Sequence, residues 1–231
     1  DFATINGRKC CLQVAYFKLS NSRAFFLRAY YKQTHEMLFD AHNHAFRVFG
    51  GVPERGIYDN MKTAVDKVRS GKQRDVNRRF QSLVSHYLFE AEFCNPAAGW
   101  EKGQVEKQVA NIRQWLFTPK PRFKTLTALN DWLLMRCHSM AERNHPVFKD
   151  KTIDELYQEE LPHCRPAMAP FDGYCEKVLK VSPSCLISYD RNRYSVPSLY
   201  VGQAVTLRAY ADRLVILVDH QVVAEHPRCY G

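Results

Sequence analysis

Two acidic residues stand out in a basic chain, because each lies where a carboxylate can hold a metal ion. Asp59 closes a β-branched and aromatic run, Gly-Ile-Tyr-Asp-Asn, at 56–60. Glu106 lies in Lys-Gly-Gln-Val-Glu-Lys at 102–107, within a predicted helix rich in Lys and Arg. Carboxylate oxygens are the ligands that Mg²⁺ prefers, and two ions about 4 Å apart can serve both ends of an in-line displacement at phosphorus. The two residues therefore predict nucleic-acid strand chemistry.

Each of these acids also has an ordinary interpretation when it is taken alone. Asp-Asn after a strand is common turn chemistry, and a Glu on an amphipathic helix is usually a solvated surface residue. The basic run at 62–79 is typical of a solvated loop, with contact to phosphates as the alternative. His42 and His44 lie two positions apart on a predicted helix and do not share a face, so we interpret both as structural.

Composition narrows the possible partners and the compartment. Lys and Arg number 33 against 24 Asp and Glu, a formal charge of +9 over 231 residues, which favours a polyanionic partner. The eight Cys include no Cys-x-x-Cys pair, which disfavours a zinc site and favours free thiols in a reducing cytosol. No apolar stretch approaches the 18 or so residues of a membrane span. The chain begins without an initiator Met, and we expect it to be part of a longer protein.

Hydrophobic periodicity predicts an alternation of strands and helices in the first 120 residues. The predicted elements, in chain order, are strands at 8–19 and 23–31, a helix ending at Gly50-Gly51, a strand at 55–58, a polar loop at 60–76, a helix at 80–88, a strand at 90–94 and a helix at 100–117. This order is that of an RNase H-like α/β fold with a mixed sheet flanked by helices. In that fold, metal-binding carboxylates lie on the first strand, the fourth strand and a later helix. The first strand would precede residue 8, where Asp1 is the only acid.

The remainder of the chain changes character after residue 160. Helices are predicted at 126–142 and 153–160, followed by a Pro-rich linker at 161–174. Six short β-rich runs follow, which favours a small antiparallel β-barrel. We therefore predict three parts: a catalytic core at 1–120, a helical connection and linker at 121–174, and a β-barrel at 175–231. Arginines of the last part, such as Arg208 and Arg213, fit either DNA contact or surface charge.

One block is specific enough to indicate a family. Phe49-Gly-Gly-Val-Pro-Glu-Arg-Gly-Ile-Tyr-Asp-Asn-Met-Lys-Thr-Ala-Val65 resembles the second-Asp block of IstA-type insertion-sequence transposases, which belong to the retroviral-integrase-like DDE group. Asp1-Phe2 is similar to the end of the first-Asp block, and Lys102-Gly-Gln-Val-Glu106 to the third block. The resemblance implies that Asp1, Asp59 and Glu106 are the catalytic metal ligands, holding two Mg²⁺ or Mn²⁺ ions. Water would cut the DNA strand, and the freed 3′-OH would then attack target DNA.

The resemblance also implies partners and a location. It implies a multimer on transposon ends and target DNA, a partner AAA+ ATPase, no membrane, and a bacterial cytoplasmic, nucleoid-associated location. Lys102 and Arg113 share a helical face with Glu106, so Arg113 is placed to reach a phosphate. Lys107 adds positive potential beside them, and Lys62 is placed to follow the DNA backbone. We expect these four residues to contact DNA.

Two other functions fit the same residues. A decayed mobile element would leave a catalytically inactive DNA-binding or assembly module with the same fold and charge. A nuclease of RNase H type would act on RNA–DNA hybrids instead, although the predicted barrel and the transposase-like blocks argue against it. Convergence of all three carboxylates would separate the first alternative from a transposase.

Overall fold

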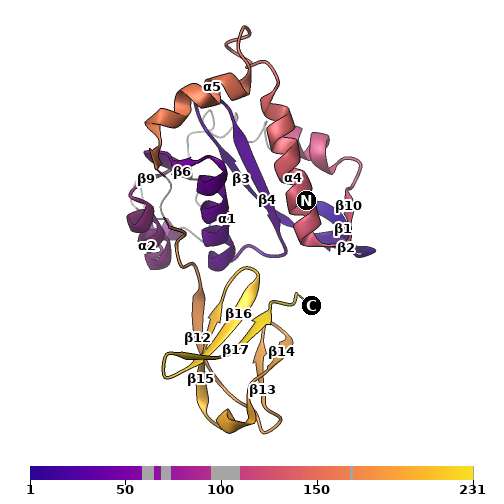
Figure 1. The fold of residues 1–231 in the computed structure, drawn as a ribbon, viewed down its shortest axis with the longest axis vertical. Helices are drawn as coiled ribbons and strands as arrows, with labels where there is room; N and C mark the ends of the chain where they lie inside the picture. The colour runs from indigo at the N-terminus through magenta and orange to yellow at the C-terminus, as the bar shows by residue number, and fades with distance from the viewer. Residues whose placement is uncertain (59–64, 69–73, 95–109, 167–168, 231) are drawn as a thin grey trace. The chain divides into compact units, whose positions relative to one another are not determined.

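The computed structural model describes residues 1–58, 65–68, 74–94, 110–166 and 169–230, with the side chains of 65–68 and 74–76 left out (Figure 1). The chain divides into two compact units. Unit 1 comprises Asp1–Gln33 and Ala41–Phe171, and unit 2 comprises Thr34–Asp40 and Asp172–Gly231. No helix within the described ranges is both long enough and apolar enough to cross a membrane.

Unit 1 begins with a tight β-hairpin. Strand β1 (Phe2–Ile5) pairs antiparallel with β2 (Arg8–Cys11), and β10 (Arg122–Phe123) pairs parallel with the other edge of β1. Asn6 and Gly7 form the turn, with φ of 48° and 76°. Positive φ at both central residues is the backbone of a type I′ turn, which Asn-Gly favours and which matches the twist of the strands.

The single strand predicted at 8–19 is wrong in one respect, because the run changes its pairing partner at Leu12. The Leu12 amide donates to the Asp1 carbonyl, so it still belongs to the first hairpin. The residues that follow form β3 (Gln13–Lys18), which pairs antiparallel with β4 (Phe25–Tyr30). Leu12 itself is fully buried. The antiparallel neighbour predicted at 23–31 is confirmed.

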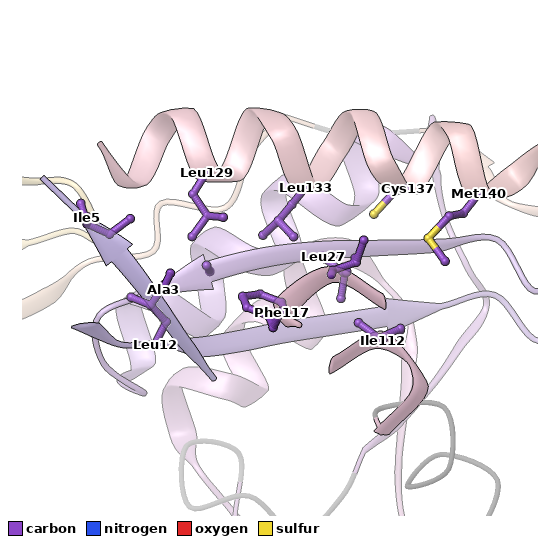
Figure 2. Packing of buried hydrophobic residues seen from close by; sticks show 12 residues of the cluster. Ala3, Ile5, Leu12, Leu27, Ile112, Phe117, Leu129, Leu133, Cys137 and Met140 are labelled. Carbon is purple, nitrogen blue, oxygen red and sulfur yellow. The ribbon is translucent and has the colours of Figure 1, made fainter. Parts of the chain in front are cut away.

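A hydrophobic core joins these strands to α4 (Leu126–Ala141). Thr125 caps α4 by accepting from the Ala128 amide, as its type and position favour. Apolar residues at helical spacing on α4 point toward β4, where Leu27 meets them (Figure 2). These residues of α4 are Leu129, Leu133, Cys137 and Met140. Residues 110–117 are helical as predicted and add Ile112, Leu116 and Phe117 to the same core.

Helix α1 (His35–Val48) begins in unit 2, and its residues from Ala41 onward belong to unit 1. Short strands follow it in the sequence, before and after Asp59. Strand β6 (Arg55–Tyr58) is the strand predicted at 55–58, whereas β5 (Gly51–Val52) just before it was not predicted. The loop predicted at 60–76 is wrong in part, because β7 (Val65–Val68) and β8 (Arg74–Val76) pair antiparallel within it. The β-branched residues at the ends of this run favour extended pairing despite its many charges.

Helix α2 (Arg78–Tyr87) and β9 (Glu90–Phe93) follow and match the predicted helix and strand. The Asn77 side chain caps α2 by accepting from the amides of Arg79 and Phe80. Helix α5 (Ile153–Glu160) begins with a capping box between Thr152 and Glu155. The predicted linker then contains a 3₁₀ turn, η1 (Leu161–His163), and β11 (Arg165–Pro166), which pairs with β5.

Unit 2 is antiparallel β-structure built from the six predicted runs. The strands are β12 (Cys175–Lys180), β13 (Leu186–Tyr189), β14 (Asn192–Ser195), β15 (Ala204–Ala209), β16 (Arg213–Val218) and β17 (Gln221–Pro227), with a 3₁₀ turn, η2 (Ser198–Tyr200). The ladders form one sheet in the order β12-β15-β16-β17 and a second sheet of β13 and β14. Among the described residues no ladder joins the two sheets, so the closed barrel stays a prediction.

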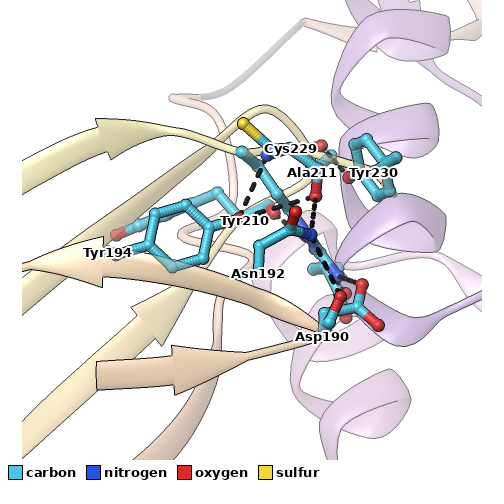
Figure 3. A network of polar contacts seen from close by, with 9 residues as sticks. Asp190, Asn192, Tyr194, Tyr210, Ala211, Cys229 and Tyr230 are labelled. Atoms are coloured by element: carbon cyan, nitrogen blue, oxygen red, sulfur yellow. Dashed lines mark hydrogen bonds and ion pairs between the residues drawn. The ribbon is translucent and has the colours of Figure 1, made fainter. Parts of the chain in front are cut away.

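The chain after β17 is tied back onto unit 2 by polar contacts (Figure 3). The backbone amide of Cys229 donates to the Tyr194 hydroxyl at 3.1 Å, and the side-chain amide of Asn192 donates to the Cys229 carbonyl at 3.0 Å. Arg228 pairs with Glu36 of the α1 segment in the same unit, at 2.7 Å, and both side chains are almost fully buried. These contacts fix the last residues of unit 2 without a further strand.

Candidate functional site

Asp1 is held in place by the backbone of the first hairpin. Its terminal amine donates to the Leu12 carbonyl at 2.9 Å, and the Leu12 amide donates to the Asp1 carbonyl at 2.7 Å. This reciprocal pair continues the β1–β2 register, in which Phe2 faces Cys11. Asp1 therefore has the backbone position of a strand residue.

The pleat of β1 determines the face on which the Asp1 side chain lies. Side chains two apart on a strand share a face, so Asp1 shares its face with Ala3 and Ile5. Both of these residues are buried in the core that also contains Ile112 and Leu116. The strand thus brings the carboxylate to the side of the sheet on which residues 110–117 contribute to the core.

Arg113 forms an ion pair with this carboxylate. Its Nε lies 2.9 Å from Oδ1 of Asp1. The two side chains differ in exposure, at 60% for Arg113 and 13% for Asp1. The structure places the Arg113 guanidinium on Asp1, the first predicted metal ligand, and contact of Arg113 with DNA stays a prediction.

The end of β6 is the second anchor of the candidate site, since Asp59 follows it directly. β6 runs parallel to β9, with Tyr58 opposite Phe93. The Cys94 amide donates to the Tyr58 carbonyl at 2.9 Å. The pairing therefore continues to the last residue before Asp59.

The Tyr58 side chain is fixed by a buried aromatic cluster. Its hydroxyl lies 2.9 Å from Nε2 of His42, which is fully buried on α1. Phe80 of α2 meets the Tyr58 ring edge to face at a centroid distance of 5.1 Å, and Phe93 lies at 6.0 Å. Burial raises the pKa of the Tyr58 phenol, so it stays protonated and keeps its hydrogen bond at physiological pH.

The other predicted site residues lie outside the described residues. These are Asp59, Glu106, Lys62, Lys102 and Lys107. Within the described part of the chain, no three His, Cys, Asp or Glu side chains gather so as to hold a metal ion. Asp1 is thus the one predicted metal ligand whose position the structure gives. Its hard carboxylate oxygens suit Mg²⁺ or Mn²⁺, and its fixed backbone suits a ligand role.

Two contacts of this region were not predicted from the sequence. Arg113 and Asp1 are far apart in the chain, so their pairing needs the fold, although the spacing of Arg113 from Glu106 did place it near the candidate site. The sequence indicated only a structural role for His42 and did not predict its hydrogen bond to Tyr58, the residue before Asp59. The signal available was the aromatic run that ends at Tyr58, because a buried Tyr hydroxyl usually has a hydrogen-bond partner.

Comparison with known proteins relates the chain to transposases. Residues 166–231 match the family described as Mu transposase, C-terminal domain. The whole chain is 57% identical to a transposase of Aminobacter aminovorans, over 99% of this chain and 45% of the relative. It is 53% identical to the transposase for insertion sequences IS1326/IS1353 of Pseudomonas aeruginosa, over 100% and 46%.

A more distant relative extends the same relation. The transposase for insertion sequence element IS21 of Pseudomonas aeruginosa is 31% identical, over 97% of this chain and 58% of the relative. The chain spans about half the length of the curated relatives it matches.

A solved structure is similar over nearly the whole chain. It is a chain of the simian T-cell lymphotropic virus intasome in complex with PP2A regulatory subunit B56 gamma. The TM-score is 0.51 at 13% identity, with 98% of this chain and 73% of that chain covered. At this identity the likeness shows the fold alone. The protein thus has a mixed α/β architecture shared with a component of a retroviral intasome.

Proposed function

We propose that the chain is the catalytic part of a DDE transposase of the IstA type, with an RNase H-like core and a small β-barrel at 175–231. It would cut DNA at transposon ends and join the freed 3′ end to target DNA. The observation that carries this proposal is the placement of Asp1. Its backbone is fixed by the Leu12 pair at the start of β1, and the first strand is the element that would carry the first acid of such a site.

The end of β6 supports the same site. Tyr58 is locked by the Cys94 amide and by His42, and Asp59 comes next in the chain. A strand end that is fixed in this way favours a preorganised site. The similarity to several insertion-sequence transposases supports the assignment independently of these contacts.

The proposed site residues would comprise metal ligands and DNA contacts. Asp1, Asp59 and Glu106 would hold two Mg²⁺ or Mn²⁺ ions. Such ions, when bound, supply activation of the attacking oxygen and stabilisation of the leaving oxygen. Lys62, Lys102, Lys107 and Arg113 would hold the phosphates of the DNA in position.

The proposal includes assembly partners. We infer a multimer that brings transposon ends together and a partner AAA+ ATPase. The similarity to the IS21 transposase is compatible with both of these partners.

Metal-dependent cleavage of a transposon-end duplex tests the proposal. Asp1→Asn, Asp59→Asn and Glu106→Gln should each reduce the cleavage rate at least about a hundredfold, because each removes a ligand of the ions that stabilise the transition state. DNA binding measured in EDTA should change less than about threefold, because the neutral variants remove no phosphate contact.

Glu90→Gln is the matched control, since Glu90 is an exposed acid on β9 outside the proposed site. It should cut at the unmodified rate. Normal cleavage by any of the three site variants would refute the ligand assignment. Tight DNA binding by the unmodified chain with no cleavage in Mg²⁺ or Mn²⁺ would favour the inactive assembly module.

A further inference from the structure

The ion pair between Arg113 and Asp1 occupies an oxygen that the proposed function assigns to a metal ion. Arg113 Nε lies 2.9 Å from Asp1 Oδ1, the distance of a charge-assisted hydrogen bond. A guanidinium has donors only and keeps its charge at every physiological pH. It therefore competes with any other cation for that oxygen.

The two partners differ in how freely they can move. Asp1 is fixed by two backbone hydrogen bonds to Leu12, and its side chain is only 13% exposed. Arg113 is 60% exposed, on a helical segment whose Ile112 and Leu116 are buried in the core. The carboxylate is therefore the fixed partner, while the guanidinium can leave for solvent without disturbing its own helix.

We propose that Arg113 is the resident counter-ion of Asp1 in the metal-free protein, and that a divalent cation must displace it to bind. This inference rests on the proposed function, because it takes Asp1 as a metal ligand. Arg113 thereby lowers the cost of keeping a largely buried carboxylate charged before the metal arrives. It also sets the metal concentration at which the site fills.

The competition has a definite direction. A Mg²⁺ or Mn²⁺ ion binds a carboxylate oxygen at about 2.1 Å, and a guanidinium on the same oxygen would repel it at close range. The metal-bound state therefore has Arg113 displaced, while the metal-free state keeps the pair. Removing the guanidinium should then favour the metal-bound state.

Mn²⁺ binding to the DNA-free chain, measured by titration calorimetry or by the loss of the free-ion electron paramagnetic resonance signal, tests this. Arg113→Gln should tighten Mn²⁺ binding roughly threefold to fivefold, the upper range for an ion pair with one exposed partner. The Asp1→Asn/Arg113→Gln double variant should bind Mn²⁺ no more tightly than Asp1→Asn alone, because the competition acts through Asp1.

Arg122→Gln is the matched control, since it removes the same charge from β10, beside the other end of β1. Its Mn²⁺ affinity should equal that of the unmodified chain. Unchanged affinity in Arg113→Gln, or an equal gain in Arg122→Gln, would overturn the inference. The proposed function fails separately, if Asp1→Asn and Asp59→Asn bind Mn²⁺ as tightly as the unmodified chain.

Discussion

The hydroxyl of Tyr58 and Nε2 of His42 share a buried hydrogen bond of 2.9 Å, which links the end of β6 to α1. The bond is enclosed by aromatic rings, with Phe17 meeting the His42 ring edge to face at a centroid distance of 4.8 Å. Because Asp59 follows Tyr58 in the sequence, this bond helps to fix the strand end that directly precedes the second predicted acid.

A double-mutant cycle on this pair should show strong coupling. His42→Phe and Tyr58→Phe should each lower the unfolding free energy by about 1–3 kcal/mol, because each leaves a buried polar group without this partner. The double variant should lose less than the sum of the two single losses, since neither partner of this bond remains buried without the other. Urea unfolding measures all four proteins, and strictly additive losses would show that the bond contributes nothing specific.

The buried amide of Asn130 gives a second prediction. From α4 it accepts from the Ala29 amide at 2.7 Å and donates to the Ala29 carbonyl at 3.1 Å, so it pairs with β4 as a neighbouring strand would. Asn130→Leu should cost about 2–4 kcal/mol of unfolding free energy, because two buried backbone groups lose a partner. Asp131→Asn, at the exposed position beside it, should change the same quantity by less than about 0.5 kcal/mol. Equal effects of the two changes would contradict the role given to the Asn130 amide.

The buried Glu36–Arg228 pair gives a third prediction, about unit 2. Glu36→Ala should lower the unfolding free energy by about 3 kcal/mol, because Arg228 would remain buried without its nearest carboxylate. Asp212→Ala removes an exposed partner of Arg213 and should cost less than about 1 kcal/mol. Chemical denaturation followed by circular dichroism compares the two variants, and a smaller loss for Glu36→Ala than for Asp212→Ala would refute the prediction.

The same pair predicts a loss of stability in acid. Burial acts to raise the pKa of Glu36, but hydrogen bonds and the charge of Arg228 outweigh it and hold the pKa below its ordinary value of 4.5. A carboxyl with a lowered pKa in the folded state stabilises the protein above its unfolded pKa, and this contribution is lost as pH falls through the lowered value. Unfolding free energies measured from pH 7 down to pH 3 should therefore fall less steeply in Glu36→Gln than in the unmodified chain. Parallel pH profiles would contradict this sign.

Sequence periodicity predicted the elements well where one face of each is buried. The helix at 126–142 was readable because Leu129 and Leu133 recur at helical spacing, and the structure buries both. The six runs of unit 2 were readable for the same reason, with alternation of period two. The change of partner at Leu12 was not readable, because a strand looks the same in sequence whichever neighbour it pairs with.

The candidate site was predictable by residue type but not by contact. Asp1 could be named from the order of elements and the resemblance of Asp1-Phe2, whereas its ion pair with Arg113 depends on how β1 and residues 110–117 meet in the core. The hairpin at 65–76 was missed because its charged residues outweigh its few valines in any hydrophobic pattern. The convergence of Asp1, Asp59 and Glu106 stays a prediction.

The Asn6-Gly7 turn has a consequence for the side chain at the opposite end of its strand. A two-residue turn sets Ile5 opposite Arg8, and this register continues to the pair of Asp1 and Leu12. A shift of one residue between β1 and β2 would turn every side chain of β1 to the other face of the sheet. The two-residue length of the turn therefore determines which face of the sheet carries the Asp1 side chain, although Asp1 lies five positions before Asn6 in the sequence.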